Sequence, residues 1–354
     1  MTERVDLLII GAGPAGGAAA IAAAQRGLSV LLVERKKEIG VPVQCAEFIP
    51  LPLGNRARAD GVLMQRISGM KSILPSGAVE ETDFPGLMID RARFDQALAE
   101  SAADAGAEVW THSRLMRLDD GIAQILRAGR STSSVAYKAL IGADGPHSSV
   151  AELLGLPALE TVNTRQYTVE LKRAYTDTDI WLSADYPGGY AWLFPKDREA
   201  NLGLGADKRF LTDLKQPLDA LHRQLVEIGL VGSAIRARTG GAIPVGGMRD
   251  RLVVGNAIFA GDAAGLTHPI TGGGIAAAVA SGEMAGQAAA EFILANDEDA
   301  LSEYEDDIRD QFEVTLQRAV ARRSWLNERW TSAAAGADTT HRYGWIAFPE
   351  YFSP

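Results

Sequence analysis

The sequence contains one cysteine, Cys45, among 354 residues, which excludes an internal disulfide bond and any metal site built from several thiolates. We expect no metal site and, from this sparse cysteine usage, a cytoplasmic protein. Basic residues are also few, 35 against 45 acidic ones. Because nucleic-acid binding requires a basic surface, the formal charge of −10 argues against DNA or RNA as a partner.

Long apolar runs are scarce as well. The uncharged stretch LLIIGAGPAGGAAAIAAA (7–24) has the length of a signal peptide or a membrane span. Asp6 directly precedes it, and glycine and proline interrupt its centre, which argues against one continuous apolar helix. A strand followed by a glycine turn explains these residues better.

Residues 5–34 have the pattern of a βαβ unit, with strands at 5–10 and 28–34 and a helix of small residues at 14–26. A strand, a glycine turn and a helix in this order form the phosphate-binding half of dinucleotide-binding folds. The alternative is a plain βαβ crossover that binds no ligand.

The turn carries the motif G-x-G-x-x-G, formed by Gly11, Gly13 and Gly16. Gly11 allows the tight turn, Gly13 lets a pyrophosphate approach the backbone, and Gly16 lets the helix pack against the strand. The free N–H groups of the helix start attract phosphate. Glu34, at the end of the second strand, can accept hydrogen bonds from a ribose. We therefore expect a bound dinucleotide.

Two later strands each end in an aspartate next to a glycine. The segment ALIGADGPHSSV (139–150) places Asp144 after a strand, and the segment 256–286 places Asp262 in the same way. Gly272–Gly274 then lead into another helix of small residues. Asp262 can bind a ribityl or ribose hydroxyl, and the N–H groups of the glycine triplet can stabilise negative charge on a reduced flavin ring.

These segments, in this order, resemble the FAD-dependent oxidoreductases of the p-hydroxybenzoate hydroxylase superfamily over roughly residues 5–285. Within it, the sequence most resembles the geranylgeranyl reductase family, through VPVQCAEFI (41–49), IDRARFD (89–95) and PGGYAWLFP (187–195). The resemblance implies an α/β protein: a Rossmann-like FAD-binding domain of the GR2 type, an inserted antiparallel β-sheet substrate domain and a helical C-terminal tail.

The expected parts of the chain are an FAD-binding region in three pieces (1–74, 75–160 with short substrate-domain strands near 75–90, and 251–295), the antiparallel sheet (161–250) and the tail (296–354). The FAD-binding residues, implied by the motifs and the resemblance, are Gly11, Gly13, Ala15, Gly16, Glu34, Arg35, Cys45, Ala46, Phe48, Arg91, Asp144, Gly261, Asp262, Gly272, Gly273, Gly274 and Ile275. Phe48 departs from the family, which often has glycine there.

The stretch YPGGYAWLFP (186–195) places Tyr190, Trp192 and Phe194 on one face of a strand. The next strand, ANLGLGAD (200–207), carries glycines that leave room beside these aromatic rings. By residue type alone the rings fill a core. The family resemblance favours the floor of a pocket for an apolar or aromatic substrate that faces the flavin.

We assign catalytic roles to Cys45, Tyr190 and Trp192. For Cys45 the alternatives are a small buried hydrophobe, an FAD contact, or a redox or acid group that protonates substrate. His147 and His268 lie near the two aspartate motifs and are interpreted as structural or as neighbours of the cofactor, with proton transfer by His268 as the alternative.

The tail predicts a helix over 301–330 that starts acidic and ends basic, in keeping with the helix dipole. Its basic, aromatic end either packs on the main body or offers a surface to an acidic protein partner or a peripheral membrane. Residues 333–340 read as a flexible linker, and residues 342–352 are expected to dock on the body or cap the pocket. The basic and aromatic side chains at the helix end are Arg318, Arg322, Arg323, Arg329, Trp325 and Trp330.

The family resemblance implies reduction of C=C bonds in an isoprenoid substrate by reduced flavin. The same scaffold also supports flavin-dependent monooxygenation of an aromatic group, either in a small molecule or in a protein side chain during cofactor maturation. An electron-transfer flavoprotein is the third interpretation. Because the chain lacks a second G-x-G-x-x-G motif, the electron donor, NAD(P)H or a ferredoxin-like protein, is left open.

Overall fold

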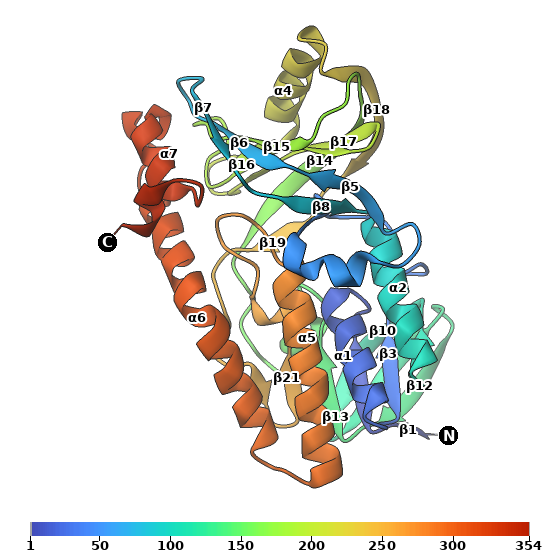
Figure 1. Ribbon diagram of the computed structural model, residues 1–354. Helices are drawn as coiled ribbons and strands as arrows, with labels where there is room; N and C mark the ends of the chain where they lie inside the picture. Colours follow the sequence, from blue (N-terminus) through green and yellow to red (C-terminus); the bar gives the residue numbers. More distant parts are fainter. Residues whose placement is uncertain (1, 354) are drawn as a thin grey trace.

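The computed structural model describes residues 2–353, and Figure 1 shows an α/β part below an antiparallel sheet. The α/β part is built on a six-stranded sheet in the order β20-β21-β13-β2-β3-β9, parallel except at β20. A four-stranded sheet, β1-β12-β11-β10, contributes side chains to the same core. The strands are β1 (Thr2–Arg4), β2 (Leu7–Ile10), β3 (Val30–Val33), β9 (Glu108–Trp110), β10 (Ser113–Asp119), β11 (Ile122–Arg127), β12 (Ser131–Ala136), β13 (Ala139–Gly142), β20 (Val253–Val254) and β21 (Ala257–Phe259).

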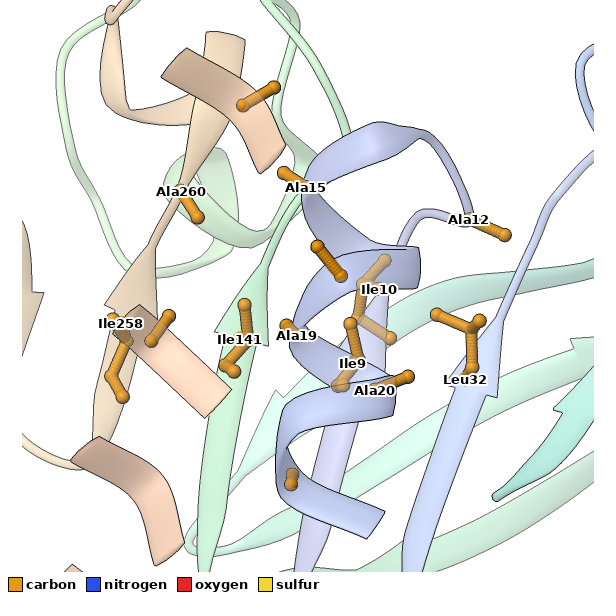
Figure 2. Packing of buried hydrophobic residues seen from close by; sticks show 14 of the residues in the cluster. Ile9, Ile10, Ala12, Ala15, Ala19, Ala20, Leu32, Ile141, Ile258 and Ala260 are labelled. Atoms are coloured by element: carbon orange, nitrogen blue, oxygen red, sulfur yellow. The ribbon is translucent and has the colours of Figure 1, made fainter. Parts of the chain in front are cut away.

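The predicted βαβ unit is present, and its central strands are buried along their whole length. Every residue of β2, β3 and β13 is buried, as expected for parallel strands that are covered on both faces. Three helices of this part are α1 (Pro14–Gln25), α2 (Arg91–Asp104) and α3 (Ser149–Leu153). Figure 2 shows Ala15 and Ala19 on the side of α1 that faces Ile141 and Ile258.

Helix α5 (Ile275–Ala290) packs directly on α1 through glycines. A Cβ atom on Gly282 would lie 2.1 Å from the carbonyl oxygen of Ala15, and one on Gly286 would lie 2.4 Å from that of Ala19. The two helix backbones are therefore in contact, and only glycine fits at these two positions of α5. The small residues of both helices serve this packing.

The antiparallel part is an extended sheet in the order β18-β14-β17-β16-β15-β6-β7, with β19 paired to β14. One face packs against α4 (Lys215–Glu227), and Ala191 and Leu193 point to that side. The other face carries the side chains of Tyr190, Trp192 and Phe194, as the alternation predicts. The strands are β6 (Gly69–Ile73), β7 (Val79–Thr82), β14 (Thr161–Leu171), β15 (Asp177–Trp181), β16 (Tyr190–Lys196), β17 (Glu199–Ala206), β18 (Val231–Thr239) and β19 (Ala242–Pro244).

Strand β6 corrects the expected division of the chain. Residues 1–74 were assigned to FAD binding, yet β6 pairs in parallel with β15 of the substrate sheet. A small sheet in the order β4-β8-β5 lies between the two parts, with β4 (Phe48–Pro50), β5 (Leu63–Ile67) and β8 (Gly86–Ile89). The segment between β3 and α2 therefore contributes strands to the small sheet and to the substrate sheet.

The C-terminal tail runs along the outside of both parts (Figure 1). After α5 and a π-helical turn, α6 (Ala300–Asn327) ends three residues before the predicted boundary. The linker prediction for 333–340 is wrong, because this segment forms a 3-10 turn and begins α7 (Asp338–Gly344). Asp338 is held by the N–H and Oγ–H of Ser76, at 3.0 and 2.6 Å. Among residues 2–353, no helix has both the length and the apolar character needed to cross a bilayer.

The remaining short helical turns are Leu51–Ala57, Gly261–Ala264, Glu291–Ala295, Ala333–Gly336 and Pro349–Phe352. Residues 342–352 dock on the body as predicted, with Trp345, Phe348 and Tyr351 buried.

Gly282→Ala tests the helix contact. Alanine favours a helix interior over glycine by about 1 kcal/mol, but its methyl group would meet a carbonyl oxygen that cannot rotate away. We expect a net destabilisation of about 1–3 kcal/mol, seen as a lower melting temperature by circular dichroism. Gly336→Ala is the matched control, because a Cβ there meets nothing within 4 Å. Equal melting temperatures for the two variants would contradict the contact.

Candidate active site

The three glycines of the turn before α1 differ in the space around them. A Cβ on Gly11 would lie 2.4 Å from the carbonyl oxygen of Ala143, and one on Gly16 would lie 1.8 Å from that of Gly11. A Cβ on Gly13 meets no protein atom within 4 Å. Gly11 and Gly16 are therefore required by packing, whereas Gly13 borders open space at the helix start, where a phosphate can approach the backbone.

Glu34 is buried at the end of β3, directly beside this turn. Its Oε2 accepts a hydrogen bond from the N–H of Ala12 at 3.0 Å, and its Oε1 accepts one from the N–H of Lys36 at 2.8 Å. Each carboxylate oxygen keeps a second lone pair, so the side chain is fixed and still able to accept a ribose hydroxyl. Arg35, the next predicted residue, is exposed.

One carboxylate oxygen of Asp144, which lies beside the same glycine turn, has no hydrogen-bond partner within residues 2–353. Its Oδ2 accepts hydrogen bonds from the N–H and Oγ–H of Ser149 at 2.7 and 2.8 Å. Its Oδ1 is buried and has no hydrogen-bond partner within residues 2–353. A buried carboxylate oxygen without a donor is costly. The Cα atom of Asp144 lies beside Gly11, so a polar group of a nucleotide bound there would satisfy this oxygen.

The second aspartate motif lies at the start of α5. Asp262 accepts a hydrogen bond from the Oγ–H of Thr267, and burial raises the pKa of its carboxyl group. Gly274 is so close to both that a Cβ would lie 2.7 Å from Thr267 Oγ1. The loop before it is closed by Tyr190, whose hydroxyl donates to the carbonyl of Thr271. The glycine triplet is thus held open at a helix N-terminus.

His268 supports this loop as a hydrogen-bond acceptor. The ring Nδ1 accepts hydrogen bonds from the backbone N–H groups of Ile270 and Thr271, each at 3.3 Å. The backbone N–H of His268 donates to the carbonyl of Gly273 at 3.0 Å. Burial lowers the pKa of His268 to about 4, so the ring is neutral at physiological pH and can accept. His147 is exposed, and the neighbouring Ser148 caps α3 instead.

Cys45 lies on the loop between β3 of the α/β part and β4 of the small sheet. Its Sγ accepts a hydrogen bond from the N–H of Glu47 at 3.2 Å. Desolvation raises the pKa of the thiol even though the guanidinium of Arg91 lies close by. Burial alone would lower the pKa of Arg91, but the carboxylate of Asp95, 2.8 Å from Nε, more than offsets it and keeps the charge in place.

Glu47 fastens this loop to the sheet. It has a left-handed backbone, with φ of 71°, and its side chain is buried. The carboxylate accepts from Nζ of Lys196 at 2.8 and 2.9 Å and from Nδ2 of Asn201 at 2.8 Å. It also accepts from the N–H of Arg91 at 2.9 Å. One side chain thus links β16, β17 and the start of α2.

A second chain of hydrogen bonds connects the loop with the aromatic face. The indole N–H of Trp192 donates to Oε1 of Gln166 at 3.2 Å, and Nε2 of Gln166 donates to the carbonyl of Cys45 at 3.0 Å. In the sequence, Glu47 stands out only as part of the segment VPVQCAEFI (41–49), and Gln166, Lys196 and Asn201 are not predicted. Their partners lie far away in the sequence, and no local pattern distinguishes them.

The aromatic face is covered by the C-terminal segment. Trp345 packs edge-on against Tyr190 with ring centres 4.9 Å apart, and its indole N–H donates to Oγ of Ser72 at 3.1 Å. The hollow predicted over the glycines of β17 is filled, because the Trp192 ring lies directly on Gly203. What remains between Tyr190, Trp345 and α6 is a cavity of about 30 Å³.

Three residues of that cavity wall carry buried polar atoms with no partner within residues 2–353: Arg323 Nε, Asn327 Oδ1 and Trp330 Nε1. A cavity of this size and polarity suits one or two water molecules. Basic residues at the end of α6 bind backbone carbonyl groups of the main body and the C-terminal segment. Arg323 donates to the carbonyl of Gly188 at 2.6 Å, and Arg322 donates to that of Tyr351 at 3.1 Å.

The structure therefore gathers most of the predicted residues into two neighbouring groups. The first surrounds the start of α1: Gly11, Gly13, Ala15, Gly16, Glu34, Asp144 and Gly261. The second surrounds the start of α5: Cys45, Ala46, Arg91, Asp262, Gly272, Gly273, Gly274, Ile275 and Tyr190. Phe48 packs on Gly86 and stacks with Phe84, at 5.7 Å between ring centres.

Comparison with known proteins gives matches along nearly the whole chain. Residues 6–146 match the family of FAD dependent oxidoreductases, and residues 160–241 match the geranylgeranyl reductase catalytic domain. A digeranylgeranylglycerophospholipid reductase of Methanopyrus kandleri is 36% identical over 89% of this chain and 88% of its own. One from Methanococcus aeolicus is 32% identical over 88% and 84% of the two chains.

Solved structures of other proteins share this fold. A geranylgeranyl bacteriochlorophyll reductase-like protein from Thermoplasma acidophilum has a TM-score of 0.83 and 28% identity, and the match covers 95% of each chain. A probable FAD-dependent monooxygenase from Pseudomonas aeruginosa shares the fold, with a TM-score of 0.72 and 19% identity over 94% of this chain and 99% of its own.

Gly13→Val tests the phosphate site. A Cβ atom at this position meets no protein atom within 4 Å, so folding should be kept, while the side chain fills the space for the pyrophosphate. We expect at least a tenfold loss of FAD affinity, about 1.4 kcal/mol or more, with an unchanged melting temperature of the flavin-free protein. Flavin binding equal to that of the wild type would place the pyrophosphate elsewhere.

The lowered pKa of His268 predicts that the stability of the fold depends on pH. Between pH 6.5 and about 4 the unfolded chain binds a proton at this residue that the folded chain excludes, so stability falls as the pH drops through this window. His268→Gln should make the decline of melting temperature from pH 7 to pH 4.5 shallower. His147→Gln controls for the loss of an exposed histidine, and an unchanged slope in His268→Gln would show that His268 is protonated in the fold.

Proposed function

Since this chain belongs to the geranylgeranyl reductase family of FAD-dependent oxidoreductases, we propose that it reduces C=C bonds of an isoprenoid lipid. The single observation that carries the proposal is the loop of Cys45, which joins the residues at the start of α5 to the aromatic sheet through Glu47 and Gln166. The curated relatives named digeranylgeranylglycerophospholipid reductases support this substrate class.

FAD, when bound and reduced, supplies the hydride for such a reduction. Of the chain's own residues, the start of α1 with Glu34 and Asp144 binds the nucleotide portion, and Gly272–Gly274 with Asp262 bind the ring portion. Tyr190 keeps the glycine loop in place through Thr271. The aromatic face excludes water and provides an apolar wall for the isoprenoid chain.

Cys45 is the proposed source of the proton. The raised pKa keeps its thiol protonated at neutral pH, as an acid must be before transfer. The half-buried cation of Arg91 lies close enough to stabilise the thiolate left behind. The Arg91–Asp95 pair is held by two hydrogen bonds, at 2.8 and 3.2 Å. Cys45 would therefore deliver a proton from a fixed position.

Entry of substrate requires the C-terminal segment to move. A cavity of about 30 Å³ cannot hold an isoprenoid chain, since ligand pockets measure about 300–1,000 Å³. Trp345 and Phe348 cover the aromatic face, and their displacement would open it. We propose that residues 338–352 open when substrate binds.

An anaerobic single turnover tests the function. Chemically reduced holoprotein is mixed with a lipid that carries geranylgeranyl chains, and the product is analysed by mass spectrometry. We expect the flavin to be reoxidised and the lipid to gain two hydrogen atoms for each reduced bond. A flavin that is reoxidised only by oxygen, with incorporation of an oxygen atom into an aromatic compound, would establish a monooxygenase instead. Reoxidation only by a protein acceptor would establish electron transfer.

Cys45→Ala tests the proton source. We expect reduction of the lipid to slow by about 10²-fold or more, while FAD content and flavin reduction by dithionite stay unchanged. Cys45→Ser, which retains an O–H group of similar size, should recover part of the rate with a larger solvent deuterium isotope effect. If Cys45→Ala turns over at the wild-type rate, the proton comes from another group.

A further inference from the structure

A second cleft lies beside the substrate sheet and has a different character from the aromatic face. Its volume is about 550 Å³. Tyr167, which packs with α4 on the face opposite the aromatic rings, lies behind two of its arginines. Polar side chains and backbone line it, and its lining residues include Arg165, Arg238, Gln44, Thr212, Asp213 and Gly240.

Arg165 and Arg238 converge on one ring. Tyr167 and Arg238 are directly paired across β14 and β18, and Arg165 precedes Tyr167 by two positions on the same face. The guanidinium carbons of Arg165 and Arg238 lie 5.7 and 5.8 Å from the centre of the Tyr167 ring. The hydroxyl of Tyr167 donates to Asp219 at 2.7 Å, which holds the ring in place beside the two cations.

Neither arginine has an acidic partner within 4 Å among residues 2–353. Other basic residues of this sheet are paired: Arg236 with Glu199, and Lys172 with Glu170. Two guanidinium groups held together, with no carboxylate within 4 Å of either in residues 2–353, favour an anion between or beside them. This arrangement is unexpected in a chain whose net charge is −10.

The acidic groups nearby are already occupied. Asp213 lines the cleft, but its Oδ1 accepts from the backbone N–H of Lys215 at 2.9 Å, at the start of α4. Asp219 binds both the hydroxyl of Tyr167 and Nζ of Lys215. Lys215 therefore offsets one of the two carboxylates. Nε of Arg165 donates to the hydroxyl of Tyr167 at 3.4 Å, and the terminal N–H groups of both arginines make no hydrogen bond within residues 2–353 and are free to bind a ligand.

The cleft adjoins the loop of Cys45. Gln44, in its wall, is the residue before Cys45, and its Nε2 donates to the carbonyl of Gly240 across the cleft. A ligand anchored at Arg165 and Arg238 can therefore extend to the loop of Cys45. The arginines stand on the opposite face of β14 from Gln166, which binds the same loop.

We propose that Arg165 and Arg238 form a binding site for the phosphoryl group of a ligand that reacts at the flavin. This rests on the proposed function. Two ligands of that function carry such a group: a dinucleotide electron donor, and a substrate with a phosphate head group. The planar guanidinium groups suit phosphate oxygens, to which each can donate two hydrogen bonds.

The test measures binding apart from turnover. FAD-loaded protein is titrated calorimetrically with inorganic pyrophosphate, for the wild type, for Arg165→Gln/Arg238→Gln and for the control Arg236→Gln on the same strand. We expect the double variant to bind at least about tenfold more weakly, the loss expected for hydrogen bonds to a charged group, and the control to bind as the wild type does. Equal binding by the double variant and the wild type, or no binding by either, would overturn the proposal.

Two kinetic arms identify the ligand. In the first, anaerobic flavin reduction by NADPH is followed, and in the second, dithionite-reduced protein acts on geranylgeranyl lipids with and without a phosphate. A raised KM for NADPH alone in the double variant assigns the site to the donor. A raised KM for the phosphate-bearing lipid alone assigns it to the substrate head group. If no substrate turns over at all, the proposed function fails while the pyrophosphate titration still decides the site.

Discussion

Backbone contact between α1 and α5 is the constraint on which the rest of the structure depends. Gly282 and Gly286 allow the carbonyl groups of Ala15 and Ala19 to touch α5, and the two helices run in the same direction. Because Gly282 stands seven residues after the first residue of α5 and Ala15 stands one residue after the first residue of α1, α5 extends about 9 Å further toward the substrate sheet. In the proposed function, one helix N-terminus would therefore bind the pyrophosphate, and the other, further along, would bind the ring of the same extended cofactor.

The loop of Cys45 transfers this positioning to the substrate sheet. Glu47 and Gln166 attach it to β14, β16 and β17, so that the aromatic face and the thiol keep a fixed relation. The two faces of the sheet thus differ in character. One is aromatic and lies under Trp345, and the other carries Arg165 and Arg238 on the side of α4. An apolar chain and an anionic group can in this way approach the same loop from two sides.

The sequence predicts the features that depend on neighbouring residues. The glycine motif fixes the turn at Gly11, and strict alternation places Tyr190 and Trp192 on one face, because both follow from local backbone geometry. It does not predict the contacts between distant segments. Gln166 and Cys45 are 121 positions apart, and the helix at 338 depends on Ser76, which is 262 positions away. The alanines, threonines and glycine of 333–340 read as a linker because nothing nearby shows what they pack against.

The most direct measurement is a titration of the flavin-free, folded protein with FAD, followed by absorbance and by quenching of flavin fluorescence. The account predicts saturation at one FAD per chain, with the quenching expected of a ring held beside Tyr190 and Cys45. A protein with native circular dichroism that leaves the spectrum and the fluorescence of added FAD unchanged would contradict it.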